Sequence, residues 1–92
     1  MKITGKITQV LPLQEGLSQQ GSPWKKLSIV VMEDDAQVAF PNTVLFDLFN
    51  DRIPETALAV GQHVDVYFGI RTREWNGRVY NEINAYRVTK SL

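Results

Sequence analysis

The sequence predicts an all-β domain: a small closed barrel of five strands with one short helix. Several segments alternate apolar and polar residues with a period of two, which is typical of strands that bury one face. Turn signals separate these segments, and Asn76-Gly77 is the strongest because both residues tolerate a positive φ. A chain of 92 residues is too short to cover both faces of an open five-stranded sheet. Closure into a barrel removes the free edges and is therefore favoured.

Three strands are expected in the first half of the chain. The first covers residues 1–13, and its alternation slips at Val10-Leu11, which indicates a bulge or bend. Residues 13–23 are polar and contain two glycines, so we expect a long loop that is a candidate binding loop. The second strand is expected over residues 24–33 and the third over residues 40–49.

Two longer strands are expected near the C-terminal end, over residues 63–75 and 78–89. The Asn76-Gly77 turn joins them into a hairpin. Gly5 and Gly69 lie inside strand patterns, where barrels place sharp bends. The residues expected to point into the barrel include Ile29, Val31, Val64, Val66, Phe68 and Ile70.

One short helix is expected between the third and fourth strands. Asn50 or Asp51 is a candidate N-cap, and Pro54 suits a first helical turn, so the helix is expected to run through Ala59. The resulting order, β-β-β-α-β-β, is that of the OB-fold, a five-stranded Greek-key barrel. Residues 1–92 are expected to form a single OB-fold domain. The alternative is an SH3-like barrel, which explains the position of the helix less well.

The composition argues against several classes of function. Ten basic and ten acidic residues cancel, so bulk charge does not attract the chain to nucleic acid. The sequence has no cysteine and a single histidine, His63, which excludes thiolate metal sites and a cysteine nucleophile. The serines and glycines form neither a catalytic motif nor a phosphate-binding loop. We therefore expect no enzymatic activity, no metal and no cofactor.

One hairpin concentrates the residues that suggest a ligand. Arg71, Arg73 and Trp75 share the face that points away from the barrel interior. Single-stranded nucleic acid is bound by aromatic rings that stack on bases and by cations that contact phosphates. A second cluster lies at Trp24-Lys25-Lys26, and both clusters fall on the ligand face of an OB-fold. The candidate nucleic-acid-binding residues are Trp24, Lys26, Arg71, Arg73, Trp75, Arg78 and Tyr80, and Phe49 and Tyr67 could extend this face.

The C-terminal hairpin also carries a family resemblance. Its residues Val66-Tyr67, Arg71-Thr72-Arg73, Trp75, Tyr80 and Glu82-Ile83 follow the order found in the fourth and fifth strands of bacterial single-stranded-DNA-binding proteins. The resemblance implies that Trp75 stacks on bases and that Arg71 and Arg73 contact phosphates. The Asn76-Gly77 turn is shorter than the corresponding loop of that family. Nearly the whole chain also resembles a small family of uncharacterised bacterial OB-like domains.

Three functions remain open at this point. The hairpin favours binding of single-stranded nucleic acid, with DNA preferred over RNA. The zero net charge favours instead a protein-interaction or oligomerising OB module, or an oligosaccharide-binding barrel. In the second case Trp75 would pack on Tyr80 over the barrel end, and Arg71 and Arg73 would pair with Glu82 or Glu74.

The partners and the compartment follow from the surface and from the N-terminus. Exposed aromatic residues on a small barrel predict a dimer or a higher homo-oligomer, because large apolar patches are rarely left open. The N-terminal residues alternate instead of forming the apolar run of a signal peptide, and no run is long enough to span a membrane. We therefore expect a cytoplasmic protein without membrane contact.

Overall fold

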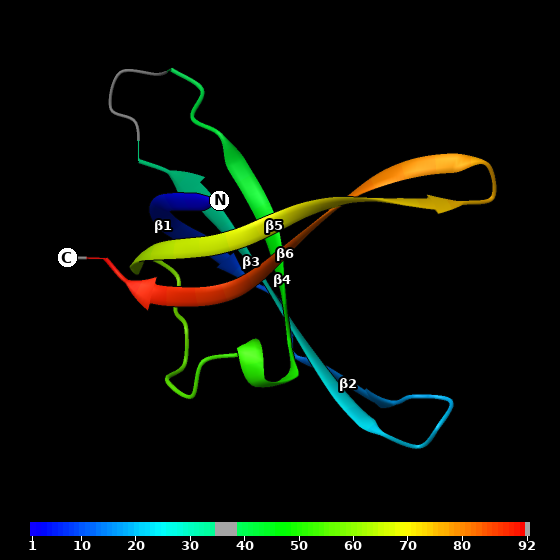
Figure 1. The fold of residues 1–92 in the computed structure, drawn as a ribbon. Helices are drawn as coiled ribbons and strands as arrows, with labels where there is room; N and C mark the ends of the chain where they lie inside the picture. The colour runs from blue at the N-terminus through cyan, green and yellow to red at the C-terminus, as the bar shows by residue number, and fades with distance from the viewer. Residues whose placement is uncertain (35–38, 92) are drawn as a thin grey trace.

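Six strands form one sheet in the computed structural model, which describes residues 1–34 and 39–91. The strand order is β1-β5-β6-β4-β3-β2, and β1 also pairs with β3, so that five of the strands close into a ring (Figure 1). The closed all-β barrel predicted from the sequence is therefore confirmed. The strands are β1 (Lys2–Val10), β2 (Gln14–Leu17), β3 (Pro23–Glu33), β4 (Thr43–Phe49), β5 (His63–Trp75) and β6 (Arg78–Lys90).

Aliphatic and aromatic side chains fill the ring. The rings of Phe46 and Phe68 lie 5.0 Å apart at its centre. Each fully buried aliphatic side chain contributes about 1.5–3 kcal/mol to folding, so these residues are the main source of stability. The predicted inward positions Ile29, Val31, Val64, Val66 and Phe68 are all buried, together with Ile3, Ile7, Phe46, Leu48 and Ala85.

The ring closes at β1, which pairs with β3 along one edge and with β5 along the other. At Gly5, β1 pairs with Glu33 of β3 and with Val64 of β5. A Cβ atom at Gly5 would collide with the backbone carbonyl oxygen of Met32, so a residue without a side chain is required there. The expected bulge in β1 is present, but the extra residue is Thr8 and the strand ends at Val10, before Pro12.

Two hairpin arms extend from the same side of the barrel (Figure 1). One consists of β2 and the first part of β3, and the other consists of β5 and β6 beyond Gly69. The radius of gyration is 14.4 Å, against about 12 Å for a compact chain of this length. The prediction that Ile70 points into the core is wrong: it lies on an arm, beyond the end of the barrel, and is 49% exposed.

The arm formed by β5 and β6 ends in the predicted turn and begins at a bulge. Asn76 and Gly77 both have positive φ, at 52° and 73°, as a two-residue hairpin turn requires. Where the arm leaves the barrel, the pairing passes from Tyr67–Arg87 to Phe68–Ala85, so that Tyr86 is an extra residue in β6.

The predicted count of five strands is wrong, because β2 lies inside the segment expected to be a loop. Residues 14–17 have no apolar alternation, since neither face of this strand reaches the core. Pairing with β3 and a contact with an aromatic ring hold it in place: a Cβ atom at Gly16 would lie only 2.7 Å from Cζ2 of Trp24. Local sequence patterns do not contain this tertiary contact.

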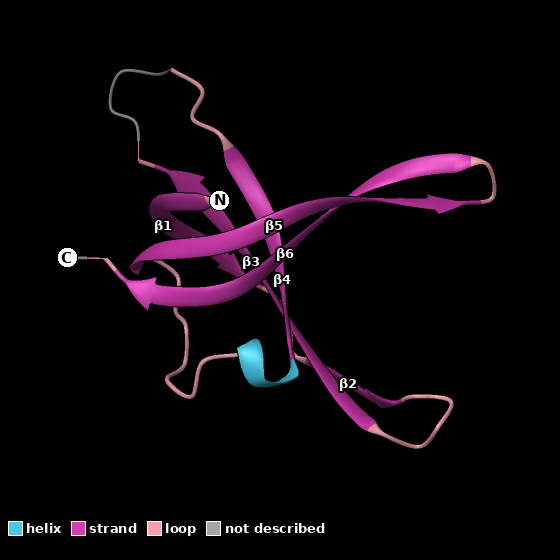
Figure 2. Cartoon of the chain, viewed as in Figure 1, coloured by secondary structure: helices cyan, strands magenta, loops and turns pink. Residues whose placement is uncertain are grey.

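The predicted helix through Ala59 is also wrong. In residues 1–34 and 39–91, helical structure is limited to the 3₁₀ turn Asn50–Arg52 (Figure 2). A residue that precedes a proline rarely adopts helical backbone angles. Ile53, which precedes Pro54, is accordingly extended, at φ −72° and ψ 122°. The Asn50 side chain does not cap a helix either, because its Oδ1 accepts a hydrogen bond from the Lys25 backbone N–H at 2.9 Å. Across the described part of the chain, no helix is long and apolar enough to span a membrane.

The third predicted strand starts later than expected. β4 begins at Thr43 instead of Phe40, since Pro41 cannot donate a ladder hydrogen bond. The remaining three predictions are accurate to within one residue: β3 starts one residue before the expected strand, β5 has the expected bounds, and β6 ends one residue after the expected strand.

Candidate nucleic-acid interface

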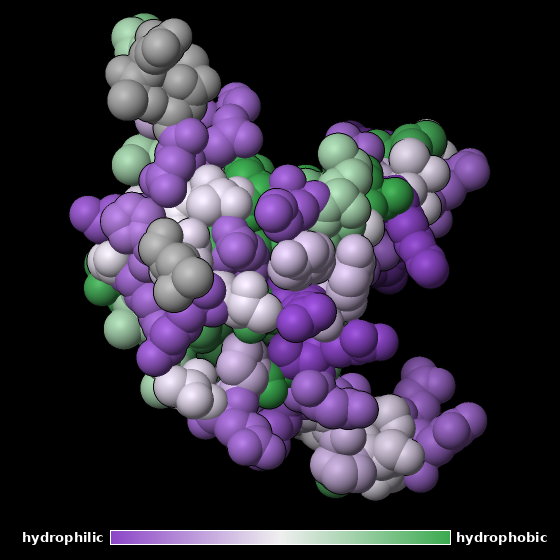
Figure 3. Space-filling model, turned by 60° about the vertical axis from the view of Figure 1, so that its left-hand side comes forward, coloured by the Kyte–Doolittle hydropathy of each residue, from purple (hydrophilic) through white to green (hydrophobic). Residues whose placement is uncertain are grey.

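A continuous sheet surface connects the two arms. The strands β3, β4, β6 and β5 are neighbours in this order. Their outward-pointing residues form one surface, which we call the outer face. On β3 and β4 it contains the pair Ser28–Asp47, and Asp47 is bridged to Asn84 of β6. The outward pairs of the β5–β6 arm are Arg71–Glu82, Arg73–Tyr80 and Trp75–Arg78. Figure 3 shows that the molecule is hollowed between the arms.

The β5–β6 arm carries a cavity of about 480 Å³ that is lined by Arg73, Trp75, Tyr80 and Glu82. Trp75 is 61% exposed and Tyr80 is 44% exposed, so both rings keep open surface. The Arg73 guanidinium Nη1 lies 3.3 Å from Glu82 Oε1. An exposed ion pair of this kind contributes at most about 1 kcal/mol, so Arg73 remains able to contact a phosphate. The expectation that an arginine of the hairpin pairs with Glu82 is thus confirmed for Arg73.

The β2–β3 arm holds its tryptophan differently. The Trp24 indole lies over Gly16 of the facing strand and is half-buried. Its neighbour Lys26 is on the same face, with Nζ 3.8 Å from Asp47 Oδ2 and 6.0 Å from the centre of the Phe49 ring. Lys25 points to the opposite face and approaches Glu15 at 3.8 Å. Trp24 therefore presents one ring face at most.

The structure brings the predicted site residues onto one surface. Trp24 and Lys26 occupy its β3 end, and Arg71, Arg73, Trp75, Arg78 and Tyr80 occupy its β5–β6 end. Phe49 extends it beside Lys26. Tyr67 also points outward from β5, but it lies near the β1 side, with Lys2 and Arg87 beside its ring. Trp75 does not cover the barrel end, since it stands on the arm beyond it.

Two residues of the outer face, Ser28 and Asp47, were not among the site residues predicted from the sequence. Ser28 Oγ donates a hydrogen bond to Asp47 Oδ1 at 2.6 Å, in the centre of the face. The alternation of residues 43–49 places Asp47 on the same side as Phe49, so this signal could have revealed it. Its contact with Ser28 depends on the register between β3 and β4, which the sequence does not show.

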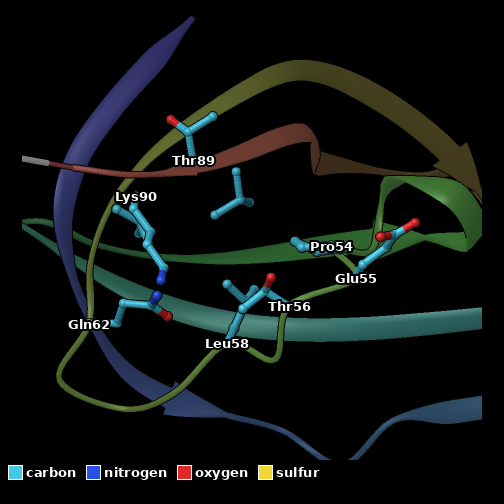
Figure 4. A pocket seen from close by; sticks show the side chains of 9 residues that line it. Pro54, Glu55, Thr56, Leu58, Gln62, Thr89 and Lys90 are labelled. Carbon is cyan, nitrogen blue, oxygen red and sulfur yellow. The ribbon is translucent and has the colours of Figure 1, made fainter.

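Another cavity, of about 430 Å³, lies between the segment that follows the 3₁₀ turn and the end of β6 (Figure 4). Its lining includes Leu58, Gln62 and Thr89, with Lys90 as its one cation and no aromatic ring. It therefore lacks the groups that stack on bases. In the part of the chain that the structure describes, no group of three acidic or histidine side chains could hold a metal ion.

Comparison with solved structures identifies the fold. The second OB-fold domain of replication protein A from Methanococcus maripaludis superposes with a TM-score of 0.68 at 16% sequence identity, covering 97% of this chain and 80% of that domain. The small single-stranded DNA-binding protein from Streptomyces coelicolor superposes with a TM-score of 0.55 at 17% identity, covering 100% of this chain and 93% of that one. The barrel described above is thus an OB-fold.

Comparison of sequences agrees with the resemblance found over nearly the whole chain. No curated protein matches the sequence. The family model described as domain of unknown function DUF3127 matches residues 2–89, and the chain therefore belongs to this family.

Proposed function

We propose that the protein binds single-stranded nucleic acid on its outer face, without catalysis. The observation that carries this proposal is the cavity on the β5–β6 arm, where the exposed rings of Trp75 and Tyr80 lie beside Arg73. A ring next to a guanidinium offers a stacking surface for a base and a donor for the adjacent phosphate. Stacking contributes about 1–3 kcal/mol per base and tolerates any sequence.

The charge distribution supports weak, local binding. Arg71, Arg73 and Arg78 project from one arm and Lys26 lies near the other, but the whole chain has no net charge. Few phosphates are neutralised by such a patch. We therefore expect a dissociation constant that is micromolar or weaker, with a shallow dependence on salt.

We propose that the ligand is DNA in preference to RNA. The two similar structures come from a domain of replication protein A and from a single-stranded DNA-binding protein. The name of the second protein specifies single-stranded DNA, which supports this preference.

The test is a titration of tryptophan fluorescence with short single-stranded DNA and RNA at low and at moderate salt. Both Trp24 and Trp75 lie on the outer face, so a ligand that stacks there should quench their emission. Quenching that weakens as salt rises is the expected result. Unchanged emission at low salt, together with no mobility shift in a gel, would refute the proposal.

A second candidate function is self-association into a dimer or a higher homo-oligomer. It is favoured by the exposed apolar residues Ile70 (49%), Val79 (68%) and Leu45 (51%) at or near the β5–β6 arm. Light scattering coupled to gel filtration measures the molar mass directly. A monomer at all concentrations up to the millimolar range would exclude this function.

A further inference from the structure

The outer face has an acidic centre, which is unexpected for a surface that binds a polyanion. The Asp47 side chain is about 29% exposed and lies between Lys26 and the arginines of the β5–β6 arm. Ser28 Oγ donates to Asp47 Oδ1 at 2.6 Å, and Lys26 Nζ lies 3.8 Å from Oδ2. These contacts fix the orientation of the carboxylate, which would repel any phosphate placed above it.

A cavity of about 370 Å³ opens beside this carboxylate. Asp47–Asn84 is the one bridge between β4 and β6 in the residues described, and the two strands separate beyond it (Figure 1). The cavity occupies that separation. Glu82 lines both this cavity and the cavity of the β5–β6 arm, so the two are neighbours on one surface. The lining consists of Thr43, Val44, Leu45, Asp47, Asn81, Glu82 and Ile83.

The two carboxylates of the lining favour ligands that donate hydrogen bonds. Ionised carboxylates such as Asp47 and Glu82 only accept, while Leu45 and Ile83 offer apolar contact to a flat ring. Cytosine presents an exocyclic amino group as a donor, whereas thymine presents the O4 acceptor at the same position. An acceptor beside a carboxylate is repelled and leaves the lone pairs of both groups unpaired.

We propose that this cavity receives a nucleobase with an exocyclic amino group, and that Asp47 accepts a hydrogen bond from that group. The protein then prefers cytosine over thymine at this position. This inference rests on the proposed binding of single-stranded nucleic acid. Lys26 lies beside Asp47 and Arg73 lines the neighbouring cavity, so both cations can contact the phosphates that flank the bound base.

Fluorescence anisotropy with labelled oligonucleotides of about ten nucleotides tests the proposal, since one OB-fold spans roughly 4–16 nucleotides. The probes are oligo-dC, oligo-dT and oligo-dU, whose bases are all pyrimidines and therefore offer stacking surfaces of similar size. We expect oligo-dC to bind about tenfold more tightly than oligo-dT, as expected for about one good base-specific contact. Oligo-dU should behave like oligo-dT, because both lack the amino group.

Two variants that each remove one negative charge separate recognition from general repulsion. Asp47→Asn keeps the side-chain shape and offers both a donor and an acceptor, so the preference for oligo-dC should fall to less than twofold. Glu15→Gln is the matched control, because Glu15 is exposed on the other arm and on the opposite face. It should leave the preference unchanged, and thermal melting should show both variants folded.

Each outcome bears on one of the two proposals. Equal affinities of the wild-type protein for oligo-dC and oligo-dT would overturn base recognition while leaving nucleic-acid binding intact. A preference that persists in Asp47→Asn, or an oligo-dU affinity equal to that of oligo-dC, would also overturn it. Failure of every oligonucleotide to bind at low salt would refute the proposed function, and base recognition with it.

Discussion

Replacing Trp75 by alanine separates a stacking role from a packing role. Trp75 is 61% exposed, so about 40% of its surface is covered in the folded protein. A fully buried aromatic side chain removes about 150–250 Å² from solvent, so the buried part of Trp75 amounts to about 60–100 Å². At about 25 cal/mol per Å², the free energy of unfolding should fall by at most about 1.5–2.5 kcal/mol. Emptying a fully buried aromatic site would cost about 3–5 kcal/mol instead.

The effect of Trp75→Ala on binding should be as large as its effect on folding. Loss of one stacked base is worth about 1–3 kcal/mol, which weakens the affinity by roughly 5- to 150-fold. Anisotropy of a labelled oligonucleotide measures the affinity without relying on the deleted fluorophore, and urea denaturation measures the stability. Val79→Ala is the control, since Val79 is exposed on the opposite face of the same arm. Unchanged affinity with a stability loss of 3 kcal/mol or more would refute the stacking role.

Three further substitutions probe other parts of the structure. Arg73→Ala should weaken binding and reduce the salt dependence by about one phosphate contact, while the stability changes by at most about 1 kcal/mol; an unchanged slope of affinity against salt would contradict this. Gly5→Ala should destabilise the barrel by roughly 1–3 kcal/mol or more, because the new Cβ meets the Met32 carbonyl, and calorimetry would show a melting temperature close to wild type if the close approach were absent. Gly16→Ala should displace the Trp24 indole, and its emission, recorded in a Trp75→Phe background, should shift to longer wavelength; an unshifted spectrum would contradict the contact.

The sequence predicts well those strands and turns whose stability depends on residues close together in the chain. The alternation from Val64 to Phe68 and the Asn76-Gly77 turn define β5 and its hairpin, because burial of one face and a positive φ leave a direct trace in the sequence. β2 leaves no such trace, since it is held by pairing with β3 and by the contact between Gly16 and Trp24. Ile70 continues the alternation, but the sequence does not show where the barrel ends.

The candidate site divides in the same way. Arg71, Arg73 and Trp75 could be predicted because they alternate within one strand. The contact of Ser28 with Asp47 joins two strands, and the cavity beside it depends on how far β4 and β6 separate. Such distances are set by the closure of the whole ring, which no single segment of the sequence contains.

The bulge at Tyr86 reveals a competition between two alignments of the same hairpin. The barrel requires Val66 opposite Val88, whereas the tight turn requires Trp75 opposite Arg78, and both are met only because one residue is left out of the ladder. With a three-residue turn and no bulge, Tyr80 would face Glu74 and Ile83 would face Arg71, since a shift of one residue reverses every side chain of a strand. The preference of Asn76-Gly77 for a two-residue turn, at the tip of the arm, therefore decides whether Tyr80 and the arginines share a face. A mutation confined to the tip would change which side chains form the outer face of the arm while the core remained intact.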